Sequence, residues 1–250
     1  MIDEDPNLMP PQALAVRRPE AVAPSKTIPP LANGDRLTRS EFERRYSAMP
    51  ELKKAELIEG VVYVPSPVGF KRHGQQTRQI CTWLGYYEAA TPGTEGGDNT
   101  TLRLDLENEP QPDAFHRIAP AAGGQSSTSP DGYVEGAPEL AVEVAASSVS
   151  YDLHDKLRVY RRNGILEYIV WRVDDEAIDW FYLVEGVYKP LEPDSAGILR
   201  SRVFPGLWLD TSAILRGDLA KVLSGLDEGL RSDEHVAFVE RLAAAKPKST

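Results

Sequence analysis

The hydrophobic positions of this chain fall into short runs that alternate between strand-like and helix-like spacing. Apolar or β-branched runs of strand length, bounded by Gly, Pro or polar residues, predict β-strands. These runs cover residues 61–64, 100–106, 113–118, 140–145, 167–173 and 199–204. The runs 178–184 and 187–191 flank Glu185-Gly186, a turn sequence, and therefore predict a β-hairpin.

Helices are predicted by apolar residues at helical spacing and by start and stop signals. Thr38 and Glu41 have the capping-box spacing at the start of a helix over residues 39–47. Apolar residues at helical spacing indicate an amphipathic helix over about residues 70–89, and Gly164 ends a helix that begins near Tyr151. Other segments are expected to form a helical turn at 51–57, a turn at 93–97, a loop at 123–130 and a helical start at 211–215.

Strands and helices alternate irregularly, so the fold class is α/β or α+β, with a mixed central sheet flanked by helices and an added β-hairpin. Residues 1–36 are rich in proline and lack periodicity, which is typical of a disordered leader. Residues 37–215 are expected to form the folded domain and residues 216–250 a C-terminal helical tail. Apolar side chains of this tail are expected to face a partner, so a homodimer is predicted.

Composition narrows the function classes. The 250 residues carry a net charge of −10, which argues against a broad nucleic-acid footprint, because non-specific DNA affinity comes from Lys and Arg. Local basic clusters such as Lys53-Lys54 and Lys71-Arg72 soften this objection, although each is more simply a solvated face. No membrane span or signal peptide is evident, and the single Cys81 cannot form an internal disulfide, so a cytoplasmic protein is expected.

The candidate chemistry lies between residues 112 and 156. Asp113 follows a proline at the start of a predicted strand, and Glu143 lies inside an apolar run, where a carboxylate is costly unless it is paired. Two carboxylates on adjacent strands can share Mg²⁺, or Mn²⁺, which accepts the same oxygen ligands. Lys156 is the candidate cation that stabilises charge on a phosphate under attack. This set predicts a metal-dependent phosphodiesterase.

Each of these residues also has a simpler interpretation. Asp113 can be an exposed turn residue, and Glu143 can form a buried ion pair with an arginine. Lys156 lies four residues after Asp152, a spacing that is typical of an ordinary helical salt bridge. A glycosidase built on Asp113 and Glu143 is conceivable, but a neighbouring lysine suits phosphate better than sugar.

These residues belong to a longer series of sequence blocks that resembles a known protein family. The blocks Ala55-Glu-Leu-Ile-Glu-Gly60, Pro112-Asp113, Glu139-Leu-Ala-Val-Glu143, Asp152…Lys156…Tyr160 and Phe204-Pro-Gly206 stand in the same order as in the Uma2-like proteins. These restriction-endonuclease-like proteins belong to the PD-(D/E)XK nuclease superfamily. The resemblance covers roughly residues 38–215 and implies a restriction-endonuclease-like fold with DNA as substrate.

The resemblance also implies roles for further residues. Glu56 matches the family's glutamate, which implies a third metal ligand beside Asp113 and Glu143. His73 matches the family's histidine and is expected to contact phosphate or carry a proton, although a helix-capping role fits equally. The superfamily's usual lysine would stand at position 145, where this chain has alanine. In Uma2-like proteins the lysine comes from the following helix, and the resemblance implies that Lys156 is this lysine. Asp152 is expected to orient this lysine.

Two functions follow. The first is a Mg²⁺-dependent endonuclease that uses Asp113, Glu143, Lys156 and Glu56. The second is a nuclease-fold protein that has become a binding or scaffolding module, which the acidic balance and Ala145 favour. An active site predicts that Lys156 points toward Asp113 and Glu143, whereas a degenerate one predicts that Lys156 turns to Asp152 and solvent.

Overall fold

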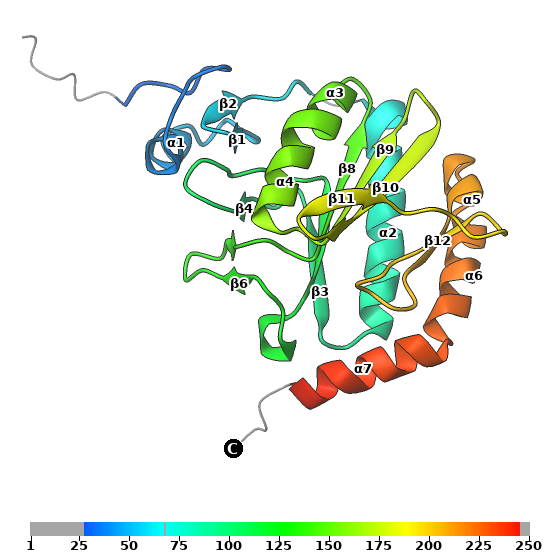
Figure 1. Ribbon diagram of the computed structural model, residues 1–250. Coiled ribbons are helices and arrows are strands. Elements are labelled where there is room, and N and C mark those ends of the chain that lie inside the picture. Colours follow the sequence, from blue (N-terminus) through cyan, green and yellow to red (C-terminus); the bar gives the residue numbers. More distant parts are fainter. Residues whose placement is uncertain (1–27, 68, 246–250) are drawn as a thin grey trace, which may run out of the picture.

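A six-stranded mixed β-sheet lies at the centre of the computed structural model, which describes residues 28–67 and 69–245 (Figure 1). Its strand order is β11-β10-β9-β8-β5-β3, with β8 and β9 parallel and the other neighbours antiparallel. The strands are β1 (Glu56–Ile58), β2 (Val61–Tyr63), β3 (Thr94–Asp98), β4 (Leu102–Arg103), β5 (Ala114–Ile118), β6 (Ser127–Thr128), β7 (Val134–Glu135), β8 (Leu140–Ala145), β9 (Glu167–Arg172), β10 (Ala177–Val184), β11 (Val187–Pro190), β12 (Ile198–Arg200) and β13 (Trp208–Asp210). The predicted fold class is therefore confirmed.

Helices cover both faces of this sheet. They are α1 (Arg39–Tyr46), the π-helix η1 (Phe70–Gly74), α2 (Gln75–Ala90), the 3₁₀ turn η2 (Pro120–Ala122), α3 (Val149–Tyr151), the π-helix η3 (Asp152–Lys156), α4 (Leu157–Asn163), α5 (Thr211–Leu215), α6 (Leu219–Leu230) and α7 (Asp233–Ala245). Figure 1 shows α2 behind the sheet and α3 and α4 in front of it. Each face thus has its own hydrophobic core.

Alternation along β8 assigns its side chains to these two cores. Val142 belongs to the core under α2, whereas Ala141 and Ala145 belong to the core under α4. Successive side chains of a strand point to opposite faces, so Glu143 shares the α4 face with the two alanines. The small alanines flank the one carboxylate that this strand carries.

The predicted β-hairpin is present as β10 and β11, which extend the sheet beyond β9. Its turn residues Glu185 and Gly186 have φ of 51° and 74°. Two successive residues with positive φ characterise the type I′ turn, whose twist matches that of the flanking strands.

Residues 28–36 differ from the expected leader. Leu31 is buried in a small core with Phe42 and Val62, and Gly34 N–H donates to Val62 O at 2.8 Å. One buried leucine is enough to anchor a segment whose composition is otherwise polar and rich in proline. The rest of the expected leader, residues 1–27, lies outside the described residues.

Four apolar side chains of the C-terminal helices face the chain's own core. The prediction that these side chains face a partner is therefore wrong for these four. Val222 and Leu226 of α6 and Phe238 and Leu242 of α7 are buried in the same cluster as α2 and the sheet. An amphipathic stripe predicts that a helix packs against something, but it does not identify the surface that it covers.

Three local predictions are also wrong. Residues 93–97 were expected to form a turn, but most of them belong to β3, where Gly96 and Gly97 pair with β5. A Cβ at Gly96 would approach Phe115 O to 2.7 Å, so glycine permits this close pairing. Thr38 makes no side-chain cap hydrogen bond, and Glu41 binds arginines of α1 instead. A helical turn is expected at 51–57, but the last residues of this segment form strand β1.

No helix in the part of the chain that the structure describes is long and apolar enough to span a membrane.

Candidate active site

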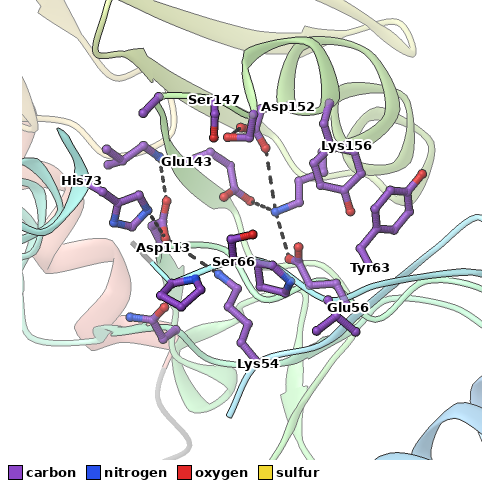
Figure 2. Close-up of a pocket in the computed structure, with 18 of the residues that line it drawn as sticks. Lys54, Glu56, Tyr63, Ser66, His73, Asp113, Glu143, Ser147, Asp152 and Lys156 are labelled. Atoms are coloured by element: carbon purple, nitrogen blue, oxygen red, sulfur yellow. Dashed lines mark hydrogen bonds and ion pairs between the residues drawn. The ribbon is translucent and has the colours of Figure 1, made fainter. Parts of the chain in front are cut away.

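A cleft of about 920 Å³ opens where β5, β8, β1, η1 and η3 meet. Figure 2 shows that charged side chains from these separate elements point toward one another in it (Figure 2). The cleft is lined by every predicted site residue, namely Glu56, His73, Asp113, Glu143, Asp152 and Lys156. Segments that are 100 residues apart in the sequence thus contribute to one site.

Asp113 and Glu143 become neighbours through strand pairing. Ala114 of β5 lies opposite Val142 of β8 in an antiparallel register, so the residue before Ala114 stands beside the residue after Val142. Asp113 Oδ2 also accepts a hydrogen bond from Val144 N at 2.8 Å, which holds this carboxylate against β8. Both carboxylates are only 3% exposed.

Asp113 has two nitrogen neighbours at its other oxygen. His73 Nε2 lies 3.1 Å from Asp113 Oδ1, and Lys54 Nζ lies 3.9 Å from the same atom. Burial raises the pKa of Asp113, but the hydrogen bond from His73 and the positive charge of Lys54 outweigh burial and lower it. Asp113 is therefore an anionic carboxylate at neutral pH. His73 is held in turn by Thr77, whose hydroxyl lies 3.2 Å from Nδ1.

Lys156 lies at the centre of the remaining carboxylates. Its Nζ is 2.8 Å from Glu143 Oε1 and 2.9 Å from Glu56 Oε1. Asp152, the partner expected from helical spacing, is farther away at 3.9 Å. Lys156 is 2% exposed and points into the cleft, so it does not have the solvent-facing orientation that a degenerate site predicts.

The electrostatics follow from having more carboxylates than cations. Burial, with further repulsion from Asp152, Asp113 and Glu56, raises the pKa of Glu143 to about 8 in spite of the attraction from Lys156. Burial lowers the pKa of Lys156, but attraction from Glu143, Glu56 and Asp152 outweighs it and raises the pKa well above its usual value. The lysine therefore remains charged, and burial makes Glu143 easier to protonate than a free glutamate.

The π-helical segment η3 positions Asp152 and Lys156, and both are buried. Ser148 donates its hydroxyl to Asp152 Oδ2 at 2.6 Å. Tyr160 comes one turn after Lys156, and its hydroxyl donates to Glu143 Oε1 at 2.8 Å. Tyr160 thus both packs in the α4 core and binds the site carboxylate.

Lys54 is the cleft residue that sequence reasoning missed, because the Lys53-Lys54 pair was interpreted as a solvated face. A usable signal was its position two residues before Glu56, a spacing that puts side chains on the same side of an extended segment. Backbone groups also support the site, since Gln111 N donates to Glu56 Oε1 at 2.7 Å. His116 and His154 lie outside the cleft lining.

Among residues 28–67 and 69–245, no group of three or more His, Cys, Asp or Glu side chains is arranged to hold a metal ion. The pair Asp113 and Glu143 is the part of the site that offers carboxylate oxygens from adjacent strands. Mg²⁺ usually keeps several waters and needs only one or two protein carboxylates. The carboxylates of Asp113 and Glu143 therefore suit the coordination chemistry of Mg²⁺.

One comparison with known proteins agrees with the family resemblance. A family model described as "Uma2: Putative restriction endonuclease" matches residues 39–212. Among solved structures, the chain is similar to a "putative nuclease belonging to DUF820" from Anabaena variabilis ATCC 29413, with 12% identity, a TM-score of 0.48, and coverage of 73% of this chain and 97% of that one. A comparison with curated proteins found no match.

Proposed function

This chain belongs to the Uma2 family, and from that premise we propose that it is a metal-dependent endonuclease that hydrolyses phosphodiester bonds of DNA. The family description supports a nuclease function in general. The observation that most supports the finer proposal is the meeting of buried Asp113, Glu143 and Lys156 in one cleft. A buried lysine beside paired carboxylates suits a reaction in which negative charge accumulates on phosphate oxygens.

In this proposal Asp113 and Glu143 would hold Mg²⁺ or Mn²⁺, and Glu56, which contacts Lys156 in this structure, would have to turn toward the ion to add a third carboxylate. The donors are hard oxygens, which suit these ions better than zinc. When bound, the ion would lower the pKa of an attacking water and polarise the scissile phosphate. Binding would lower the pKa of Glu143, because a bound cation stabilises the carboxylate form that burial disfavours.

The chain's own side chains have separable roles. Lys156, held protonated by its three carboxylates, stabilises the charge on the phosphate oxygens. Glu56 and Asp152 orient this ammonium, and Tyr160 fixes the carboxylate of Glu143. In this proposal His73, which contacts Asp113, exchanges a proton or contacts the phosphate.

Compartment and assembly are parts of the same proposal. A reducing cytoplasm fits the single Cys81, whose thiol is made unreactive because burial raises its pKa to about 11. A homodimer stays a prediction, and it requires a surface other than the four buried C-terminal side chains.

Plasmid nicking tests the proposal. Purified protein is incubated with supercoiled plasmid in Mg²⁺, Mn²⁺ or EDTA, beside Asp113→Asn, Lys156→Met and the control Lys189→Gln. Lys189 is exposed on β11, outside the cleft lining, so its variant removes a lysine charge without touching the site. We expect metal-dependent nicking that falls roughly 100- to 1000-fold in Lys156→Met and is retained in Lys189→Gln. Nicking that survives EDTA, or that both site variants retain while folded, would contradict the proposal.

A binding or scaffolding module is the second candidate. The observation that favours it is Ala145, which is fully buried in the α4 core where the wider superfamily carries a lysine. This candidate predicts no cleavage of duplex or single-stranded DNA in any metal. Calorimetric titration with Mn²⁺ then shows whether the protein still binds an ion at this site. Asp113→Asn, which removes one carboxylate, is the matched control.

A further inference from the structure

The chemistry of the cleft lies below the molecular surface. Asp113, Glu143 and Lys156 are 2–3% exposed, and they lie in a cavity of about 920 Å³. Cavities of this size enclose ligands about as large as a drug molecule. An intact B-DNA duplex is wider than its major groove of about 12 Å, so a single strand reaches side chains this far below the surface with less rearrangement than a duplex needs.

An exposed aromatic side chain stands beside the mouth of this cleft. Phe70 is 71% exposed, although burying a phenylalanine normally contributes about 1.5–3 kcal/mol. It begins η1, between Gly69 and Arg72, which both line the cleft. A Cβ on Gly74 would lie 3.9 Å from Phe70 Cδ2, so the ring lies against η1 with its other surface open to solvent.

Positive charge that the fold does not neutralise lies in the cleft lining, at Lys53, and next to Phe70 in η1, at Lys71. Lys53 and Lys71 are exposed and form no ion pair within the described part of the chain. Lys54 reaches into the cleft toward Asp113, and Arg72 pairs with Asp174 at the surface. The chain is acidic overall, so this local excess of cations beside an exposed ring is a departure from its average surface.

We propose that this side of the cleft binds an unpaired nucleic-acid strand, with Phe70 stacked on a base next to the phosphate that enters the cleft. The inference rests on the proposed function and specifies its substrate class as a single strand, a flap or a frayed end. Aromatic platforms combined with a cationic groove are the general means of binding single strands, because every base has a face that can stack. Lys53, Lys54 and Lys71 contact the backbone of that strand.

Fluorescence anisotropy in EDTA tests the inference without any cleavage. The probes are a labelled oligothymidine of about 12 nucleotides and a blunt duplex of the same length. The proteins are the full chain, Phe70→Ala, Phe70→Leu, Phe70→Trp and the control Leu106→Ala. Leu106 is 75% exposed and lies outside the cleft lining, so its variant removes comparable apolar surface elsewhere.

We expect the full chain to bind the single strand more tightly than the duplex. Phe70→Ala and Phe70→Leu should weaken single-strand binding roughly 5- to 150-fold, the effect of losing one stacked base. Phe70→Trp and Leu106→Ala should retain it. Leucine is the decisive variant, because it keeps the apolar surface and loses the aromatic face.

Tighter binding of the duplex, or equal single-strand binding by the wild type and Phe70→Ala, would overturn the inference. Its failure can be told apart from failure of the proposed function. Nicking of intact duplex with no effect of Phe70 leaves the endonuclease proposal standing and removes this one. Strand binding that depends on Phe70, with no cleavage in any metal, supports the strand site and removes the catalytic proposal.

Discussion

The buried ammonium of Lys156 balances three carboxylates, so its removal tests the electrostatics of the site directly. None of these four side chains is more than 5% exposed, and Nζ lies 2.8 Å from Glu143 and 2.9 Å from Glu56. At an effective dielectric constant of about 20, each of these pairs contributes roughly 6 kcal/mol of Coulomb attraction. Most of that attraction offsets the cost of burying the charges.

The substitution Lys156→Met keeps most of the length of the side chain and removes its charge. Three buried carboxylates then have no central cation, and we expect the free energy of unfolding to fall by about 3–5 kcal/mol at pH 9. The loss should be smaller at pH 6. Burial already raises the pKa values of Glu143 and Asp152 above those of the unfolded chain, so the folded variant gains protons as the pH falls and loses stability as it rises.

Urea unfolding followed by tryptophan fluorescence measures this at both pH values, for the wild type, Lys156→Met, Glu143→Gln and the double variant. Removing the Glu143 charge should restore part of the loss, with a coupling energy of about 1–3 kcal/mol between the two sites. The reasoning is refuted if Lys156→Met is as stable as the wild type at pH 9, or if the two substitutions are additive.

Two further predictions concern stability away from the cleft. Burial lowers the pKa of His116 from 6.5 to about 4. Between these pH values the imidazole is protonated in the unfolded chain but not in the folded one, so the free energy of unfolding falls by up to about 3 kcal/mol as the pH falls from 6.5 to 4. Urea titrations should show that His116→Leu lacks this loss and that the exposed-site control His154→Gln retains it; equal pH slopes would contradict the assignment. In α6, Gly229→Ala would overlap Gly206 O and should lower the melting temperature, whereas Gly225→Ala meets nothing within 4 Å and should raise stability by about 1 kcal/mol. Thermal unfolding compares the two, and equal shifts would show that α6 does not pack closely at Gly229.

Local pattern was sufficient for most elements of the sheet. The run 140–145 coincides with β8, and the hairpin turn at Glu185-Gly186 lies where the sequence predicts it. These signals succeed because strand periodicity and turn chemistry act over a few residues. They fail at β3, where Gly96 and Gly97 form a strand only because β5 lies alongside.

The candidate site was predictable to the extent that its residues have unusual local settings. A carboxylate in an apolar strand and an aspartate at a strand start single out Glu143 and Asp113 from the sequence alone. The family resemblance added Glu56 and His73. Lys54 was missed because its role depends on which carboxylate folds next to it, and an isolated pair of lysines carries no such information.

Alternation of side chains along a strand is enough to predict that Glu143 points away from Val142 and Val144. That this direction leads to Lys156 rather than to solvent depends on long-range packing, since α4 covers that face. The same division holds for Lys156, whose spacing to Asp152 predicts a surface pair. Its actual partners come from β8 and β1, and burial makes those distant contacts stronger than the nearby one.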